Sequence, residues 1–389
     1  ERIMRDLRRD AAVLDDVELS DYLNGVAAKL AASTGGQSFD LFPVQDATMN
    51  AFALPGGFIG VHTGLIVAAE TESELASVLA HEIGHVTQRH IARMLSGQRQ
   101  TTLGTLAAVV LAALAARSNP QAAAGIVTMA SGAQHQQMLS FSRDAEREAD
   151  RVGLDTLRAA GFDPNGMVSF FGRLQQATRV YESAAPAYMR SHPMTVERIA
   201  DIQSRVQEGR YRQHPDSIEF RLVRARLQAT GDGGVDALRG GRARFERLLR
   251  EKTTNDETAA WYGVAVAAAG QRDFDAAGAA IQQVRRRIPQ GHPYVERLAA
   301  EVAMRSGDAA GALKLAETAA ARFPQARALV RLQAEALLAK GEPARAAAFL
   351  ERRMAAQRLD DGEWRLLARA LEAQGQTARA HQASAEAYA

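Results

Sequence analysis

The sequence predicts a mainly α-helical protein of the α+β class, in which a domain with a small β-sheet is followed by an α-solenoid. Two observations lead to this prediction. Strand-like patterning is confined to residues 39–67, whereas helical periodicity dominates the rest of the chain. Beyond residue 217 the helices become rich in Ala, Arg and Leu and repeat at a nearly constant interval. With 389 residues, 47% of them hydrophobic and 24% charged, the chain can bury a sizeable core.

Composition excludes several kinds of site. The net charge of +2 gives no indication of nucleic-acid binding, and we expect none. The chain has no cysteine, which excludes disulfides, thiolate metal ligands and a cysteine nucleophile. Any metal must therefore be bound by His, Asp or Glu. The first residue is Glu rather than Met, and we expect a processed chain from which a signal peptide has been removed.

The first domain is expected to span residues 1–210 and to begin with a helix followed by strands. Residues 1–34 carry apolar side chains at helical spacing up to the break at "TGGQ". Residues 39–67 contain "FDLFPVQ", "NAFALPGG" and "FIGVHTGLI", which alternate or run apolar between Pro and Gly. Such short segments are typical of strands, so we expect a small sheet here.

A helix is predicted to start near Glu72, because Thr71 and Glu74 form a capping-box pattern, and to run to about Met94. The following segment, 97–140, is rich in Ala, Gly and Gln. Its most apolar part has 14 uncharged residues, fewer than the ~20 that a membrane-spanning helix needs. We therefore expect no transmembrane segment there, but a buried helix, a lid or a stretch in peripheral contact with a membrane.

The second domain is predicted over residues 218–389, after a polar linker with Gly and Pro at 208–217. Glycines that each close a helical run recur at spacings of 37, 34 and 34; they are Gly270, Gly307, Gly341 and Gly375. A helix–turn–helix period of 34 residues with small residues at fixed offsets resembles the tetratricopeptide repeat. Such a solenoid is expected to bind a client or partner protein.

The stretch "SVLAHEIGHVTQRH" places two histidines four residues apart on a predicted helix. His81 and His85 then share one face, where two neutral imidazoles can bind one zinc ion. Glu82 points to the side and can act as a general base towards water. Gly84 costs helix stability and leaves room for the close approach of another element. His90 is expected on a different face, at the surface. The same pattern also arises by chance on solvated helices.

A third ligand must come from elsewhere, and "DAEREADRVG" offers carboxylates on a second predicted helix. Glu146 and Asp150 stand four residues apart, and the small residues Ala149 and Gly153 complete the same face. This face could pack against the glycine of the first helix. Glu146 would then bind the metal, and Asp150 would accept a hydrogen bond from a ligand histidine. Glu148 is the rival ligand, and spacing alone leaves both open.

Four segments, in this order, resemble one peptidase family: "NAFALPGGFIGVHTGLI", "HEIGHVTQRH", "SRDAEREADRVG" and "SHPMTVERI". The family includes the membrane heat-shock protease HtpX, the CAAX-prenyl endopeptidases and the mitochondrial protease Oma. Its Glu-x-x-Ala-Asp pattern falls on Glu146, Ala149 and Asp150, and so favours Glu146 over Glu148 as the ligand. The added repeats and the lack of long apolar spans resemble the BepA-like branch, which contains periplasmic chaperone-proteases for outer-membrane proteins.

The resemblance implies a gluzincin-type metalloprotease domain with one zinc ion per chain, and it puts the "SHPMTVERIADIQ" segment near the active site. His192 precedes Pro193 and therefore lies on a bend. From there it could bind the zinc as a latch or donate to the oxyanion, and Arg198 could stabilise the oxyanion. The alternative for His192 is a helix-start histidine held by local hydrogen bonds.

An extended protein substrate is expected to add as a strand along a predicted edge strand, whose residues are Asn50, Ala51, Phe52 and Ala53. The sequence thus predicts a periplasmic zinc endopeptidase that degrades misfolded or stalled envelope proteins. Its repeat domain would bind clients or a partner such as the outer-membrane assembly machinery. A different class of function is a chaperone or assembly scaffold for outer-membrane proteins, with a latent peptidase.

Overall fold

The computed structural model describes residues 12–97, 143–180, 187–207 and 214–387. It divides into two compact units, Glu1–Phe220 and Arg221–Ala389. The segment 97–140, for which a lid or a buried helix was one expectation, lies outside the described residues except for its first residue. Within the described ranges no helix is both long and apolar enough to cross a membrane.

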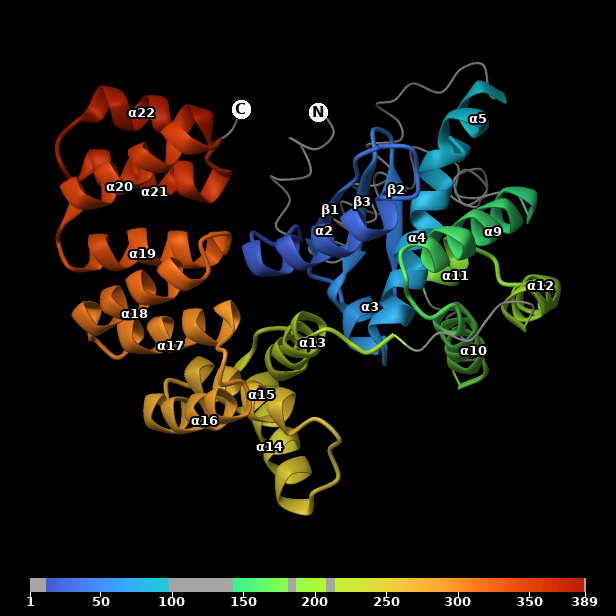
Figure 1. Ribbon diagram of the computed structural model, residues 1–389, viewed down its shortest axis with the longest axis horizontal. Helices are drawn as coiled ribbons and strands as arrows, with labels where there is room; N and C mark the ends of the chain where they lie inside the picture. Colours follow the sequence, from blue (N-terminus) through green and yellow to red (C-terminus); the bar gives the residue numbers. More distant parts are fainter. Residues whose placement is uncertain (1–11, 98–142, 181–186, 208–213, 388–389) are drawn as a thin grey trace, which may run out of the picture. The chain divides into compact units, whose positions relative to one another are not determined.

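The first unit contains a three-stranded mixed sheet in the order β1-β3-β2. Strand β1 (Asp40–Val44) runs parallel to β3 (Phe58–His62), and β2 (Ala51–Leu54) runs antiparallel to β3. Strand β2 therefore forms one edge of the sheet (Figure 1). The expected strand did not continue to residue 67, because α3 (Thr63–Ala68) begins directly after β3. The backbone N–H of Gly64 donates to the carbonyl of Asp46, which turns the chain away from the sheet.

Helix α4 (Glu72–Thr87) is central to the first unit. The Thr71 hydroxyl caps its amino end by accepting a hydrogen bond from the backbone N–H of Glu74. It packs against strand β2 and against two later helices, α9 (Arg143–Ala159) and α10 (Asn165–Val180), as Figure 1 shows. The remaining described helices of this unit are α2 (Val17–Ala31), α5 (His90–Gly97), α11 (Ala187–Ser191) and α12 (Val196–Gln207).

The expected single helix to about Met94 is wrong, because the chain breaks between α4 and α5. The backbone N–H of Gln88 still donates to Gly84, but that of Arg89 donates to Val86, one residue tighter than an α-helix. Arg89 adopts a positive φ of 55°, which ends the helix. The next helix, α5, begins at His90.

The second unit is an α-solenoid, as predicted. Its helices pack against their sequence neighbours; they are α13 (Ile218–Thr230), which begins just before the unit boundary, α14 (Val235–Glu251), α15 (Glu257–Gly270), α16 (Phe274–Arg287), α17 (Pro293–Arg305), α18 (Ala309–Arg322), α19 (Arg327–Ala339), α20 (Pro343–Ala356), α21 (Asp361–Glu372) and α22 (Thr377–Glu386). The starts of α17, α19 and α21 are 34 residues apart. Gly307, Gly341 and Gly375 take φ values of 98°, 74° and 74° in the turns within successive pairs. Glycine is needed there because other residues rarely adopt such angles.

Candidate metal centre

Small residues bring the backbones of α4 and α9 close together. A Cβ atom added to Gly84 would lie 2.9 Å from the carbonyl oxygen of Ala149. A Cβ added to Gly153 would lie 3.0 Å from the backbone nitrogen of His81. The predicted packing of the two small-residue faces is therefore confirmed. It sets side chains of α4 and α9 directly opposite each other.

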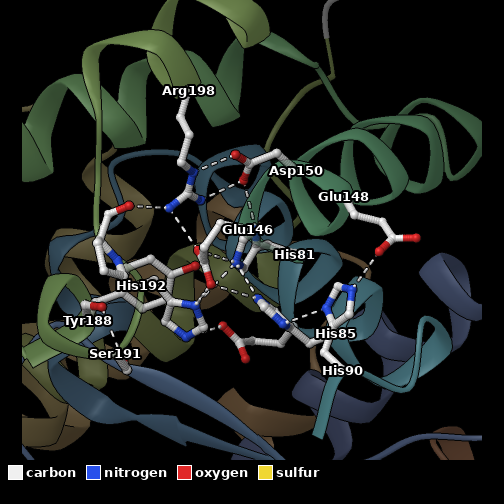
Figure 2. A network of polar contacts seen from close by, with 12 residues as sticks. His81, His85, His90, Glu146, Glu148, Asp150, Tyr188, Ser191, His192 and Arg198 are labelled. Atoms are coloured by element: carbon white, nitrogen blue, oxygen red, sulfur yellow. Dashed lines mark hydrogen bonds and ion pairs between the residues drawn. The ribbon is translucent and has the colours of Figure 1, made fainter. Parts of the chain in front are cut away.

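Four buried side chains converge where these helices meet: His81, His85, Glu146 and His192. The Nε2 atoms of His81 and His85 are 2.9 Å apart. The Glu146 carboxylate lies 3.5 Å from the first of these nitrogens and 3.4 Å from the second. Figure 2 shows the two histidines and the glutamate facing one centre. The structure thus brings the three predicted ligands together.

The spacing of these donor atoms fits a tetrahedral metal ion. At metal–nitrogen distances of about 2.0–2.1 Å, neighbouring donors of such an ion lie about 3.3 Å apart. The observed separations are 2.9 Å between the two Nε2 atoms, 3.5 Å from His81 to Oε2 of Glu146 and 3.4 Å from His85 to Oε1 of Glu146. Nitrogen and carboxylate oxygen are also the donors that remain in a chain without cysteine.

The environment of His81 favours a positive charge at this centre. Its Nδ1 atom lies 2.9 Å from the Asp150 carboxylate, as predicted for an orienting partner, so that Nε2 is the atom directed at the centre. Burial alone would lower the pKa of His81, but hydrogen bonds with Asp150 and Glu146 raise it to about 9. By contrast, burial is the main cause that lowers the pKa of His85 well below its usual value, which keeps this imidazole neutral and able to bind a metal.

Arg198 lies behind the centre and holds its carboxylates. The guanidinium donates to both oxygens of Asp150 at 2.7 and 2.8 Å. Its Nη1 atom lies 2.7 Å from the Glu146 carboxylate and 2.7 Å from the carbonyl of Pro193. With 2% of its surface exposed, Arg198 is committed to these partners. The expected role in stabilising an oxyanion therefore does not fit, because its Nε, Nη1 and Nη2 atoms already face protein acceptors.

His90 was expected at the surface, and this expectation is wrong. Only 3% of its surface is exposed, and its Nδ1 atom lies 2.9 Å from Nδ1 of His85. The positive φ of Arg89 interrupts the helix, and the His90 side chain then lies against His85. Glu148, the rival ligand, instead contacts Nε2 of His90 at 3.0 Å and no atom of the donor cluster (Figure 2). The sequence analysis assumed one continuous helix, on which His90 does not face His85, and so it did not predict the contacts of His90.

Glu82 is fully buried beside the donor cluster. One of its carboxylate oxygens lies 3.3 Å from Nε2 of His192, and the backbone of Ala53 on β2 is a further polar neighbour. Burial raises the pKa of this carboxyl, while the charges of His192 and His81 oppose the rise. A buried carboxylate whose pKa is raised in this way is suited to accept a proton.

His192 is the fourth member of the cluster. Its Nδ1 atom lies 3.1 Å from the Glu146 carboxylate and 3.4 Å from Nε2 of His81. Tyr188, one turn earlier on α11, stacks on its ring with 4.5 Å between centroids. The sequence reasoning missed Tyr188; an aromatic residue four positions before the histidine was the available signal. Local hydrogen bonding does not account for the position of this imidazole, because its side-chain polar contacts with His81, Glu82 and Glu146 come from α4 and α9.

The residues expected to bind substrate lie on or next to β2. The carbonyl of Asn50 accepts a hydrogen bond from the backbone N–H of His62. Ala51, Phe52 and Ala53 pair with β3 on one side only, among the described strands. Because α4 packs against β2, this edge strand lies next to the helix that carries the two histidines.

Comparisons with known proteins agree with this geometry. The sequence pattern of peptidase family M48 matches residues 14–206. A beta-barrel assembly-enhancing protease of Escherichia coli (strain K12) is 32% identical over 298 residues, which are 75% of this chain and 60% of that protein. The chain therefore spans about three fifths of the length of this relative. Metalloprotease LoiP of Escherichia coli (strain K12) is 30% identical over 195 residues, 49% of this chain and 71% of that protein.

Among solved structures, a tetratricopeptide repeat protein from Parabacteroides merdae is 15% identical and aligns with a TM-score of 0.38. The alignment covers 63% of this chain and 86% of that protein.

Proposed function

Because the chain belongs to peptidase family M48 and is a metallopeptidase, we propose that it is a zinc-dependent endopeptidase that degrades misfolded or stalled envelope proteins. One observation carries this proposal. His81, His85 and Glu146 converge in a buried cluster with the spacing of a tetrahedral metal site, and the buried carboxylate of Glu82 lies beside it.

One zinc ion per chain would be held by Nε2 of His81, Nε2 of His85 and the Glu146 carboxylate. When bound there, zinc supplies Lewis acidity that polarises the scissile carbonyl and lowers the pKa of the attacking water. Glu82 accepts the proton of that water at its carboxylate and passes it to the leaving amine. Asp150 orients the His81 ring, and Arg198 orients the Asp150 and Glu146 carboxylates.

An extended protein substrate would bind along the outer side of β2, residues Ala51–Leu54, by adding a strand to the sheet. Main-chain hydrogen bonds would then provide most of the recognition, with little demand on the substrate sequence. Such binding suits a peptidase that acts on unfolded segments of many proteins. Asn50 lies at the start of this edge.

His192 would act as a latch that holds the peptidase in a closed state. Three protein ligands leave a fourth position, which must be open to water in the active enzyme. The Nδ1 atom of His192 belongs to the same donor cluster as the other three ligands and can fill this position. The bend at Pro193 allows the imidazole to swing aside when substrate enters. The competing role, donation to the oxyanion, predicts the opposite effect of removing it.

The domain organisation that fits this function is a metallopeptidase domain over residues 1–210 and a tetratricopeptide-like domain over residues 218–389. The helix pairs of the second domain would bind a client or a partner protein. The name of one relative, a beta-barrel assembly-enhancing protease, supports a partner in outer-membrane protein assembly. From the resemblance of the sequence to its family, we further propose a periplasmic location for this chain.

A second candidate is a chaperone or assembly scaffold whose peptidase is latent. The observation that favours it is the position of His192 within the donor cluster, where it would exclude water from the metal. Degradation of casein by the wild-type protein and by Glu82→Gln separates the two functions. A working endopeptidase loses at least ~10²-fold activity in this variant while it retains zinc. Wild-type protein that binds zinc but leaves casein intact would favour the scaffold.

A further inference from the structure

The two nitrogens of the His85 ring face different partners. Its Nε2 atom faces the proposed metal position, 2.9 Å from Nε2 of His81. Its Nδ1 atom lies 2.9 Å from Nδ1 of His90, with the two ring planes inclined at 74°. Both imidazoles are buried, at 0% and 3% exposure. The proposed metal position lies on the other edge of the His85 ring, so at 2.9 Å one of these two Nδ1 atoms donates a proton and the other accepts it.

A carboxylate at the outer end sets the direction of this hydrogen bond. Nε2 of His90 lies 3.0 Å from Glu148, and Arg93 contacts the same carboxylate oxygen at 2.8 Å. An ionised carboxylate can only accept, so His90 must carry its proton on Nε2. With this proton on Nε2, His90 can accept at its Nδ1 atom from the Nδ1–H of His85. His85 therefore carries its proton on Nδ1, and its lone pair is on Nε2, directed at the metal.

We propose that His90, anchored by Glu148, is a positioning residue that fixes the metal-binding tautomer of His85. This inference rests on the proposed zinc function. A series of hydrogen bonds leads from the Glu148 carboxylate through the His90 ring to the His85 ring, whose Nε2 atom faces the metal position. If His90 were absent, His85 could place its proton on Nε2 and lose its ability to bind the metal in that form.

The other ligand histidine has a matching arrangement without the intermediate ring. Nδ1 of His81 lies 2.9 Å from the Asp150 carboxylate, which is an acceptor and fixes the same tautomer directly. Helix α9 supplies the carboxylates of both arrangements, since Glu148 and Asp150 are two residues apart. Glu146, two residues before Glu148, is the ligand itself. Helix α9 thus provides one proposed ligand, Glu146, and the two carboxylates that orient the ligand histidines.

A pair of nearly isosteric substitutions tests the role of His90. His90→Leu removes the acceptor for His85, whereas His90→Asn keeps an amide oxygen near the position of Nδ1. Zinc affinity of the full chain, measured by competition with a chromophoric chelator, should fall ~10–100-fold in His90→Leu. In His90→Asn it should stay within about threefold of wild type. The Co²⁺ absorption spectrum should change in the Leu variant and be retained in the Asn variant.

Stability separates positioning from packing. Only 3% of the His90 surface is exposed, and burying Leu costs less free energy than burying Asn. If His90 served only packing, the Leu variant would be the more stable of the two and would bind zinc at least as tightly. The proposal predicts the reverse order for zinc affinity. A second test removes the anchor. Glu148→Ala should weaken zinc binding about tenfold. Asp144→Ala, which removes the same charge from an exposed position on the same helix, should leave zinc binding unchanged.

The outcomes distinguish this inference from the proposed function. If wild type binds one zinc ion and His85→Ala does not, while His90→Leu and Glu148→Ala both bind zinc within about threefold of wild type, the positioning role is refuted and the zinc site stands. If wild type itself binds no zinc, or His85→Ala binds it normally, the proposed metal centre fails first. Should His90→Leu not fold, the comparison of Glu148→Ala with Asp144→Ala decides.

Discussion

Replacing Gly84 by alanine should weaken zinc binding, because it forces α4 and α9 apart. The new Cβ would lie 2.9 Å from the carbonyl oxygen and 3.2 Å from Cα of Ala149, and neither backbone atom can rotate away. Ordinary contact is about 3.5 Å, so α4 and α9 must move apart by about half an ångström. Metal–ligand distances tolerate only ~0.2 Å, and Glu146 on α9 would be drawn away from the two histidines on α4.

Two opposing effects should limit the change in the free energy of unfolding. Alanine gains about 1 kcal/mol over glycine within a helix. Overpacking at a close contact costs about 1–3 kcal/mol. The apo protein with Gly84→Ala should therefore lose about 0–2 kcal/mol. Zinc affinity, measured by chelator competition, should fall about tenfold or more. Mutations of residues that orient metal ligands cause losses of this size.

Gly172 provides the matched control. It lies within α10, is exposed, and an added Cβ there would meet no atom within 4 Å. Gly172→Ala should therefore stabilise the protein by about 1 kcal/mol, which raises the melting temperature by about 2–4 °C, and leave zinc binding unchanged. If Gly84→Ala binds zinc as tightly as Gly172→Ala does, the close approach of α4 and α9 does not position the metal ligands and the reasoning is refuted.

Three further predictions concern the ligand, the latch and the repeat domain. Glu146→Ala should hold less than one zinc ion per chain by elemental analysis, with Asp144→Ala as control, and an undiminished zinc content would remove Glu146 from the ligand set. His192→Ala should degrade casein faster than wild type because the fourth position is opened, whereas slower degradation would identify His192 as a donor to the oxyanion. The isolated fragment 218–389 should melt cooperatively as a helical unit, followed by circular dichroism, because its helix pairs stack on one another; a gradual, non-cooperative loss of helix would contradict an independent domain.

Much of the centre could be predicted because it depends on local spacing. Residues four apart on a helix share a face, which paired His81 with His85 and Glu146 with Asp150. The small residues on those same faces indicated where the helices meet, and Gly84 does pack against Ala149. The repeat unit was equally accessible, since its turns need glycine at positive φ every 34 residues.

The contacts of His90 could not be predicted, because they depend on one unusual backbone angle. On a continuous helix His90 would lie about 140° around the axis from His85, well away from the metal face. Arg89 takes a positive φ of 55°, which few non-glycine residues adopt and which no sequence pattern announced. After this break the His90 side chain is buried against His85 and does not lie on the solvent-facing side.

The role of Arg198 was misjudged for a related reason. Its proximity to the centre was expected from the family resemblance, but the direction of its guanidinium depends on tertiary packing. α12 brings Arg198 behind Asp150 and Glu146, where a bidentate ion pair at 2.7 and 2.8 Å fixes it. A charged side chain near a reactive centre can face the substrate or the ligands, and spacing does not distinguish the two.

The most direct test of the metal centre is X-ray diffraction from crystals of the zinc-loaded protein on either side of the zinc absorption edge. The account predicts one anomalous peak per chain within bonding distance of Nε2 of His81, Nε2 of His85 and the Glu146 carboxylate, at about 2.0–2.2 Å. A peak held by His90 and Glu148 instead, or no peak between α4 and α9 in protein shown to contain zinc, would contradict it.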